Sequence, residues 1–179
     1  MTDFNLQPHL SGDLVQLRPL RPDDWEALYA VASDPLIWEQ HPASNRYREE
    51  NFRTFFRGAL ESGGAFVILD RKTQRVIGST RYAGYDPANL EIEIGWTFLA
   101  RRYWGGQHNG EVKQLMLRHA FKFVDTVFFL VGPNNRRSRR ALEKIGAEYC
   151  GVQTADVDGQ SMELVRYEIR RNAAPPHQK

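Results

Sequence analysis

The sequence predicts an α/β protein in which about four helices flank a mixed, mostly antiparallel sheet of six to seven strands. Three features of the 179-residue chain indicate this class. A strand-like run near the start is followed by two amphipathic helical segments. Three strand-like runs joined by short turns come next. A long helical segment then leads to a continuous apolar run, a short helix and two final strand-like runs.

The first part of the chain contains one strand and two helices. Residues 14–20, LVQLRPL, alternate apolar and polar positions as a half-buried strand does. Residues 22–24, PDD, are favoured at a helix N-terminus, and the apolar residues after them recur at three- and four-residue spacing. A second helix is expected over residues 47–61, because two glycines starting at Gly63 follow it.

Three strands follow these helices. They cover residues 65–70 (AFVILD), 75–86 (RVIGSTRYAGYD) and 90–99 (LEIEIGWTFL). The turn RKTQ separates the first two strands, and DPAN separates the second from the third. Such short polar turns favour hairpins, so the sequence predicts an antiparallel meander.

The second half begins with a longer helix, expected over residues 109–124. Residues 126–131, TVFFLV, form a continuous apolar run, which is typical of a central strand buried on both faces. The helix has an apolar side at helical spacing. That side comprises Val112, Leu115, Met116, Ala120 and Phe123.

The last part of the chain predicts one short helix and two strands. Residues 134–147, NNRRSRRALEKIGA, contain an asparagine suited to cap a helix and a glycine, Gly146, suited to end it. Strands are expected over residues 148–156 and 161–170, on either side of the turn VDGQ. Cys150 lies in the first of these strands, where we expect it in the core.

The composition is that of an ordinary globular protein, with 41% hydrophobic and 12% aromatic residues. The net charge of +2 gives no global attraction to nucleic acid or membrane, and a single cysteine excludes an internal disulfide. No apolar stretch approaches the roughly 18 residues of a spanning helix, and the start lacks the features of a secretion signal. We expect one cytoplasmic domain over residues 1–179, with a core over 14–170 and a flexible tail over 171–179.

Three motifs carry a resemblance to a known family. They are EIGWTFLARRYWGG (93–106), NGEVKQLMLRHAF (109–121) and NNRRSRRALEKIGAEYCGV (134–152). The last combines an asparagine, a serine three residues later and Glu-Lys-x-Gly. From residue 14 to residue 170 the chain resembles a GNAT-type N-acetyltransferase that uses acetyl-CoA, and it is most similar to the ribosomal-protein N-terminal (RimJ/RimL-like) branch. The resemblance implies a splay between the fourth and fifth strands, no metal, and compatibility with a homodimer.

In this family, the loop after the fourth strand holds the cofactor pyrophosphate with backbone N–H groups at a helix N-terminus. The family pattern is Gln or Arg, two free positions, Gly, one free position, then Gly or Ala. One register begins at Arg102 and places glutamine in the last position; the other begins at Trp104. Both registers are imperfect, but the glycines still allow close approach of the backbone. The implied cofactor-binding residues are Arg102, Trp104, Gly105, Gly106, Gln107, His108, Asn109 and Gly110.

Acetyl transfer to an amine requires a base, because an unperturbed lysine-like amine is almost fully protonated at pH 7. Glu93 lies on the strand that resembles the active-site strand of the family. Glu91 points to the same face, because strand side chains alternate. Repulsion between the two carboxylates would raise one pKa. Either glutamate is a candidate base, and the alternative is that both are solvated strand residues.

The same strand is expected to stabilise the thioester oxygen. Gly95 suggests a bulge or break in the strand. The resemblance implies that the N–H group of Trp96 or of the next residue faces the oxygen. It also implies that the backbones of Thr97 and Phe98 pair with the pantetheine arm.

The leaving thiolate needs a proton or hydrogen-bond donor. Many family members use a tyrosine in the helix after the fifth strand, but Leu142 stands there in this chain. Ser138 is the remaining candidate, with an exposed helix hydroxyl as the alternative, and Asn135 is a candidate for orienting the cofactor. Arginines of the same helix could pair with phosphate. These are Arg137, Arg140 or, since the helix phase is open, Arg139.

The resemblance therefore implies an acetyl-CoA-dependent N-acetyltransferase that works by direct attack of an amine in a ternary complex. The acceptor stays open between a protein N-terminus, a lysine, a polyamine and an antibiotic amine. A first alternative is a non-catalytic acyl-CoA-binding or sensing module, favoured by the missing tyrosine and the altered loop. A second is a nucleic-acid-binding domain that uses the run RRSRR, although the nearly neutral overall charge argues against it.

Overall fold

The computed structural model describes residues 3–171, which form one eight-stranded mixed sheet and five α-helices. The sheet order is β1-β2-β3-β4-β5-β6-β8-β7. All neighbours are antiparallel except β5 and β6, which run parallel. The strands are β1 (Leu10–Ser11), β2 (Val15–Pro19), β3 (Ala65–Asp70), β4 (Val76–Asp86), β5 (Glu91–Leu99), β6 (Thr126–Val131), β7 (Glu148–Val157) and β8 (Gln160–Arg170).

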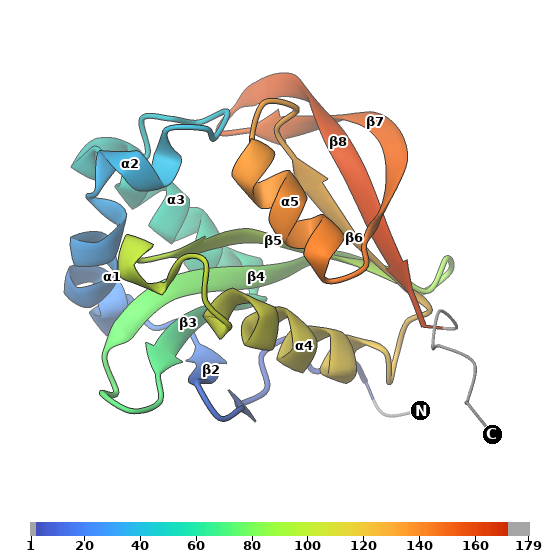
Figure 1. Cartoon of the computed structure of the whole chain (residues 1–179), viewed down its shortest axis with the longest axis horizontal. Helices are drawn as coiled ribbons and strands as arrows, with labels where there is room; N and C mark the ends of the chain where they lie inside the picture. Colours follow the sequence, from blue (N-terminus) through green and yellow to red (C-terminus); the bar gives the residue numbers. More distant parts are fainter. Residues whose placement is uncertain (1–2, 172–179) are drawn as a thin grey trace.

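The helices lie on the two faces of the sheet (Figure 1). Three cover one face and pack into a shared apolar cluster, and two cover the other face. They are α1 (Trp25–Ala32), α2 (Pro35–Trp38) and α3 (Glu49–Ser62) on the first face, and α4 (His108–Ala120) and α5 (Arg136–Lys144) on the second.

The observed elements differ from the predicted ones in a few places. The two-residue strand β1 and the single-turn helix α2 were not predicted, and β1 brings the sheet to eight strands. The helix predicted over residues 109–124 ends at Ala120, because the chain then tightens into turns in which Lys122 and Phe123 donate to backbone oxygens only three residues back. Residues 172–179 of the predicted tail lie outside the described residues.

The prediction that Cys150 is a core residue is wrong. Cys150 is exposed on β7, the last strand of the sheet order. On the same strand, Tyr149 and Val152 are 58% and 57% exposed, so apolar residues of β7 do not mark a buried face.

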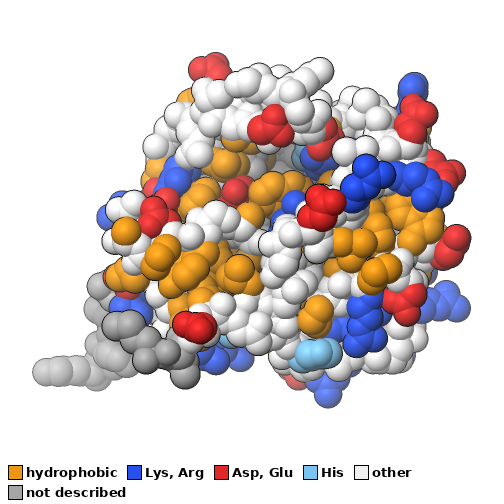
Figure 2. Space-filling view, turned by 180° about the vertical axis from the view of Figure 1, so that it is seen from behind, with side chains coloured by type: hydrophobic (Ala, Val, Ile, Leu, Met, Phe, Trp, Pro, Cys, Tyr) orange, Lys and Arg blue, Asp and Glu red, His pale blue; other side chains and the backbone are white. Residues whose placement is uncertain are grey.

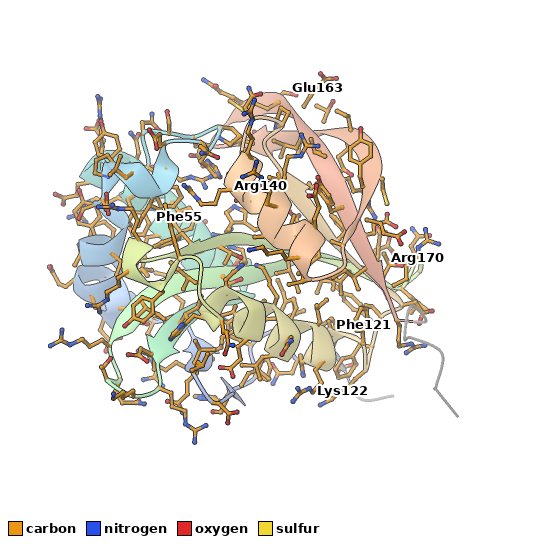
Figure 3. All side chains as sticks on the ribbon, viewed as in Figure 1. Phe55, Phe121, Lys122, Arg140, Glu163 and Arg170 are labelled. Atoms are coloured by element: carbon orange, nitrogen blue, oxygen red, sulfur yellow. The ribbon has the colours of Figure 1, made fainter. Side chains whose placement is uncertain are left out.

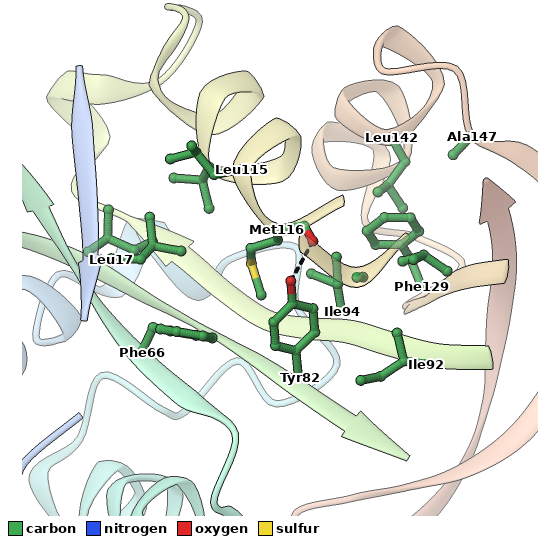
Figure 4. Close-up of a cluster of buried hydrophobic side chains, with 14 of the residues drawn as sticks. Leu17, Phe66, Tyr82, Ile92, Ile94, Leu115, Met116, Phe129, Leu142 and Ala147 are labelled. Carbon is green, nitrogen blue, oxygen red and sulfur yellow. Dashed lines mark hydrogen bonds between the residues drawn. The ribbon is translucent and has the colours of Figure 1, made fainter. Parts of the chain in front are cut away.

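The face under α4 and α5 holds the larger core (Figure 4). Tyr82 on β4 is fully buried there, and its hydroxyl donates to the backbone oxygen of Met116 on α4. Glu111, in the first turn of α4, accepts hydrogen bonds from the backbone N–H groups of residues 13–15. These two contacts fix the start and the middle of α4 against the sheet.

The opposite face, under α1–α3, is rich in packed aromatic rings. Phe52 and Phe55 of α3 stack with ring centroids 5.1 Å apart, and Trp38 of α2 lies 5.0 Å from the ring of Phe98 on β5. Aromatic pairs in this distance range add to the stabilisation that burial provides. The aromatic cluster therefore holds the short helix α2 close to β5.

Candidate active site

The parallel strands β5 and β6 diverge after a short paired segment. They pair only at Glu91–Thr126, Ile92–Val127 and Glu93–Phe128. Beyond Glu93, β5 continues to Leu99 and β6 to Val131 without pairing to each other. The splay implied by the resemblance is therefore present, and it leaves one edge of β5 free.

Strand β5 contains a bulge at the point of divergence. Arg81 of β4 pairs with Gly95, but Ser79, two residues away, pairs with Phe98, three residues away. The extra residue is accommodated at Trp96, whose φ of 52° lies in the left-handed region. Such a conformation in a bulky residue costs about 1–3 kcal/mol, so the surrounding packing must impose it. The expected break in the strand is confirmed, with the positive φ at Trp96 rather than at Gly95.

The loop between β5 and α4 offers backbone donors at a helix N-terminus. The chain forms a short 3-10 turn over Arg101–Tyr103, passes through Gly105 with a φ of 72°, and enters the 13-residue helix α4 at His108. The N–H groups from Gly105 to Gly110 donate to no other residue within 3–171. Unpaired amides at a helix N-terminus are suited to bind phosphate.

The side chains of this loop are mostly held by the chain itself. The indole N–H of Trp104 donates to the backbone oxygen of Leu99 at 3.0 Å. The guanidinium of Arg102 lies 5.0 Å from the ring centre of Tyr103, and the ring of His108 lies 4.7 Å from the same ring. The loop can therefore offer its backbone to a ligand while its side chains fix its path.

Helix α5 begins with the predicted cap. The buried side chain of Asn135 accepts a hydrogen bond from the backbone N–H of Ser138 at 3.2 Å. Ser138 is half-buried, and its hydroxyl makes no hydrogen bond to another described residue. Leu142, which stands where many family members have a tyrosine, is buried in the core. Asn135 thus has a structural role already, and Ser138 keeps a free hydroxyl.

Two of the three candidate arginines of α5 are engaged within the molecule. Arg137 stacks 3.8 Å over the ring of Trp104 and donates to the backbone oxygen of Ile37 at 3.0 Å. Arg139 donates to the hydroxyl of Tyr167 at 3.0 Å. Arg140, labelled in Figure 3, is exposed and forms no ion pair or side-chain hydrogen bond with another described residue. Arg140 is therefore the one of the three that is available to an external phosphate.

Glu93 occupies the start of the splay on the α1–α3 side of β5. It is half-buried and accepts no hydrogen bond from another described residue. Burial raises the pKa of Glu93 to about 7, although the nearby charges of Arg81 and Arg166 act in the opposite direction. A Cβ atom at position 95 would lie 3.1 Å from the Glu93 carboxylate, so Gly95 gives this side chain its room.

Glu91 lies on the same face but has a partner. Its carboxylate accepts a hydrogen bond from Arg166 of β8 at 2.8 Å. The expectation that repulsion between the two glutamates would raise a pKa is wrong, because burial is the cause of the raised pKa of Glu93. The arrangement leaves Glu93 as the glutamate without a counter-ion in contact.

Lys113 is a site residue that the sequence analysis missed. It is buried on α4, and its ammonium donates to the hydroxyl of Thr97 at 2.5 Å and lies 5.8 Å from the ring centre of Phe129. Burial lowers the pKa of Lys113 to about 7. The signal was available, because Lys113 stands three residues before Met116 and seven before Ala120 on the apolar side of the helix.

Residues 3–171 contain neither a cluster of metal-binding side chains nor a helix that could span a membrane. No group of three or more His, Cys, Asp or Glu side chains in this range could hold a metal ion. None of the helices there combines the length and the apolar character that crossing a bilayer requires.

Two parallel strands that diverge beside the N-terminus of a long helix are the arrangement found in the acetyltransferase fold of the GNAT type. The chain belongs to the GNAT acetyltransferase family, because the family model described as acetyltransferase (GNAT) domain matches residues 15–148. This membership supports acetyl transfer in general.

Individual proteins agree with this membership. YkkB of Bacillus subtilis (strain 168) is 26% identical over 156 residues, which cover 82% of this chain and 88% of YkkB. A candidate acetyltransferase structure from T. thermophilus is 31% identical with a TM-score of 0.76, covering 96% of this chain and 92% of the other. Mycobacterium smegmatis RimJ, solved in complex with CoA-disulfide, has a TM-score of 0.69 at 21% identity, covering 90% and 84%. At that identity RimJ shows the fold alone.

Proposed function

We propose that the protein transfers the acetyl group of acetyl-CoA to a primary amine, of a protein N-terminus or a small molecule, by direct attack in a ternary complex. The observation that carries the proposal is the Glu93 carboxyl group. It lies where β5 leaves β6, next to the bulge at Gly95 and Trp96, and its pKa is about 7. A base of that pKa is well matched to an amine acceptor at neutral pH.

The residues around the splay fit an acyl-CoA. Free amides from Gly105 to Gly110 would receive the pyrophosphate at the start of α4, and Arg140 would add a charge-assisted contact. The free edge of β5 at Thr97 and Phe98 would pair with the amide groups of the pantetheine arm. When bound, acetyl-CoA supplies the activated acetyl group.

Glu93 would take a proton from the acceptor ammonium before the neutral amine attacks. With a pKa of about 7, the carboxyl group is ionised above neutral pH and protonated below it. Activity should therefore fall as the pH drops through about 7. The backbone N–H of Trp96, turned by the bulge, would donate to the carbonyl oxygen as negative charge develops there.

Two residues are candidates for protonating the leaving thiolate. Ser138 has a free hydroxyl on α5, and Lys113 has a buried ammonium on α4 beside Thr97 of the splayed strand. A donor with a pKa of about 7 can protonate a thiolate whose ordinary pKa is about 8.5. Substitution of each residue in turn distinguishes the two candidates.

The test is release of free thiol from acetyl-CoA in the presence of a panel of primary amines. We expect release with the wild-type protein and a roughly 100- to 1000-fold lower rate for Glu93→Gln. Acetyl-CoA should raise the melting temperature of both proteins, because it binds the folded state.

A second candidate function is a non-catalytic acyl-CoA-binding module, favoured by the buried Leu142 where a tyrosine is common. A melting-temperature shift without thiol release from any amine would support that module and overturn the enzyme.

A further inference from the structure

Arg81 of β4 is a buried cation with no partner. Its side chain is 8% exposed, and it forms no hydrogen bond or ion pair with another residue in the part of the chain that the structure describes. Its Nε atom is sealed from solvent without an acceptor. The two terminal nitrogens of Arg81 also have no acceptor, but unlike Nε they are not fully buried. The end of the guanidinium therefore faces space that a ligand can reach.

Two neighbouring arginines, in contrast to Arg81, are paired with carboxylates. Arg46 forms two hydrogen bonds to the carboxylate of Asp158, at 2.8 and 3.0 Å. Arg166 is paired with Glu91 and with Glu168, both at 2.8 Å. Arg81 contacts only aromatic rings, although the charges of Glu93 and Asp158 favour its charged form and that of Arg46 opposes it. A buried charge without a counter-ion in contact is costly, so an anion that met the guanidinium directly would stabilise it.

The aromatic neighbours place the guanidinium on the α1–α3 side of β5, where Glu93 also lies. The centre of the Arg81 guanidinium lies 4.5 Å from the ring of Trp96 and 5.5 Å from the ring of Phe55, which is labelled in Figure 3. Trp96 belongs to the bulge of β5. Seen from behind in Figure 2, hydrophobic side chains gather across the middle of this face, with acidic and basic side chains between them.

Strand pairing brings Arg81 and Glu93 to the same face. Arg81 is opposite Gly95, and Ala83 is opposite Glu93, so the two charged residues are diagonal neighbours across the β4–β5 ladder. Diagonal neighbours on one face are separated by roughly 7–8 Å. Their charges influence each other, but their atoms do not meet as an ion pair. The two opposite charges are complementary to those of a small molecule with an ammonium and a carboxylate a few bonds apart.

We propose that the acceptor is an amino acid or a similarly small amine that carries a carboxylate, with Arg81 binding the carboxylate and Glu93 receiving a proton from the ammonium. This inference rests on the proposed function. The amine nitrogen forms a bond to the acetyl carbon while the carbon–sulfur bond breaks. Of the two protons that the ammonium loses, one passes to Glu93 and then to solvent, and the other ends on the thiol of coenzyme A.

The charges of this face argue against the other acceptors. A polyamine or an aminoglycoside would bring extra cations next to Arg81, which has no counter-ion in contact, and like charges repel. A protein N-terminus brings its ammonium but no carboxylate next to it, so it would leave Arg81 unpaired.

The experiment compares matched acceptors. Thiol release from acetyl-CoA is measured with each of the twenty amino acids and with peptides, and the best amino acid is compared with its decarboxylated amine. We expect kcat/KM to be roughly 10- to 100-fold higher for the amino acid, as for a charge-assisted hydrogen bond. In Arg81→Met the ratio of kcat/KM between the amino acid and its decarboxylated amine should fall to about one, through a higher KM for the amino acid.

Controls keep the outcomes distinct. Arg57→Met, at an exposed position of α3, should keep the wild-type preference. The melting-temperature shift with acetyl-CoA reports folding of every variant, and Arg81→Lys provides a milder change if Arg81→Met fails to fold. Equal kcat/KM for the amino acid and its decarboxylated amine, or faster reaction of peptide N-termini, would overturn the inference but leave the acetyltransferase intact. Absence of thiol release with every amine would overturn the proposed function itself.

Discussion

Against each face of strand β5 lies an ionisable group whose pKa burial has moved to about 7, and the comparison between the two groups bears on the chemistry of the site. On the α1–α3 side, burial raises the pKa of Glu93 to about 7. On the α4–α5 side, burial lowers the pKa of Lys113 to about 7. Loss of solvent thus moves an acid and a base toward neutrality from opposite directions. Near pH 7, each group can both take and give a proton.

The two groups differ in their surroundings. Glu93 is half-buried and has the cations Arg81 and Arg166 nearby, which oppose the rise of its pKa. Lys113 is sealed in the core, with a single hydroxyl partner in Thr97. The difference indicates that Glu93 is open to an acceptor from solvent, whereas Lys113 can meet only a group that enters the gap between the strands.

The largest expected effect concerns Glu93. Glu93→Gln should lower kcat/KM by roughly 100- to 1000-fold, because a positioned base contributes about that much. The wild-type rate should rise as the pH increases toward about 7, and the variant should lose this rise. The measurement is thiol release between pH 5.5 and 9.

Glu91→Gln is the matched control for this experiment. It removes the neighbouring carboxylate, which Arg166 already holds. It should therefore keep the rise of the rate with pH. A Glu93→Gln protein that still shows the rise would exclude Glu93 as the base.

The second prediction concerns stability at Lys113. The pKa is about 7 in the folded protein and 10.5 in the reference state. Below pH 7 the ammonium is charged in both states, and the folded protein bears the full cost of burying it. Between these values the unfolded state binds more protons, so stability rises with pH. Lys113→Met should therefore raise the free energy of unfolding by about 2–4 kcal/mol at pH 6, and by much less at pH 10.

Urea denaturation at the two pH values measures this effect. Lys122→Met is the control, because Lys122 is exposed just after α4 (Figure 3) and should change stability by less than about 0.5 kcal/mol. An equal effect of Lys113→Met at pH 6 and pH 10 would mean that folding does not lower the pKa of this lysine.

The sequence predicts the elements well because its signals are local. Short polar turns separate the strands of the meander, and both ends of α5 follow from single residues, the capping side chain of Asn135 and Gly146 with its φ of 89°. The strand β1 has only two residues, too few for a periodic pattern. Cys150 was misplaced because the alternation of a strand shows which residues share a face, but not whether that face is covered.

The site was harder to predict because its chemistry depends on distant partners. Alternation places Glu91 and Glu93 on one face, but Arg166, some 75 residues away from Glu91, decides which one is paired. Likewise, helical spacing places Lys113 on the apolar side of α4, but its hydrogen bond to Thr97, 16 residues earlier in the chain, forms only when α4 packs against β5. Pairings between remote segments and the loss of solvent cannot be read from local patterns.

The smallest expected effect separates Lys113 from Ser138 as the donor to the leaving thiolate. If Lys113 protonates the thiolate, Lys113→Met should lower kcat by roughly 10- to 100-fold, whereas Ser138→Ala should lower it less than threefold. The lysine must be protonated to donate, so the wild-type rate should also decline above about pH 7, giving a bell-shaped profile with Glu93.

Single-turnover measurement of thiol release with a saturating amine tests this division, because it excludes slow product release. The reverse pattern, with Ser138→Ala slow and Lys113→Met nearly unchanged, would assign the donor to α5. Lys113 would then lower the stability of the protein without contributing to the reaction. Of the two groups, only Glu93 would take part in proton transfer. Equal, large losses in both variants would instead indicate that Ser138 and Lys113 act on the same sulfur atom from neighbouring helices.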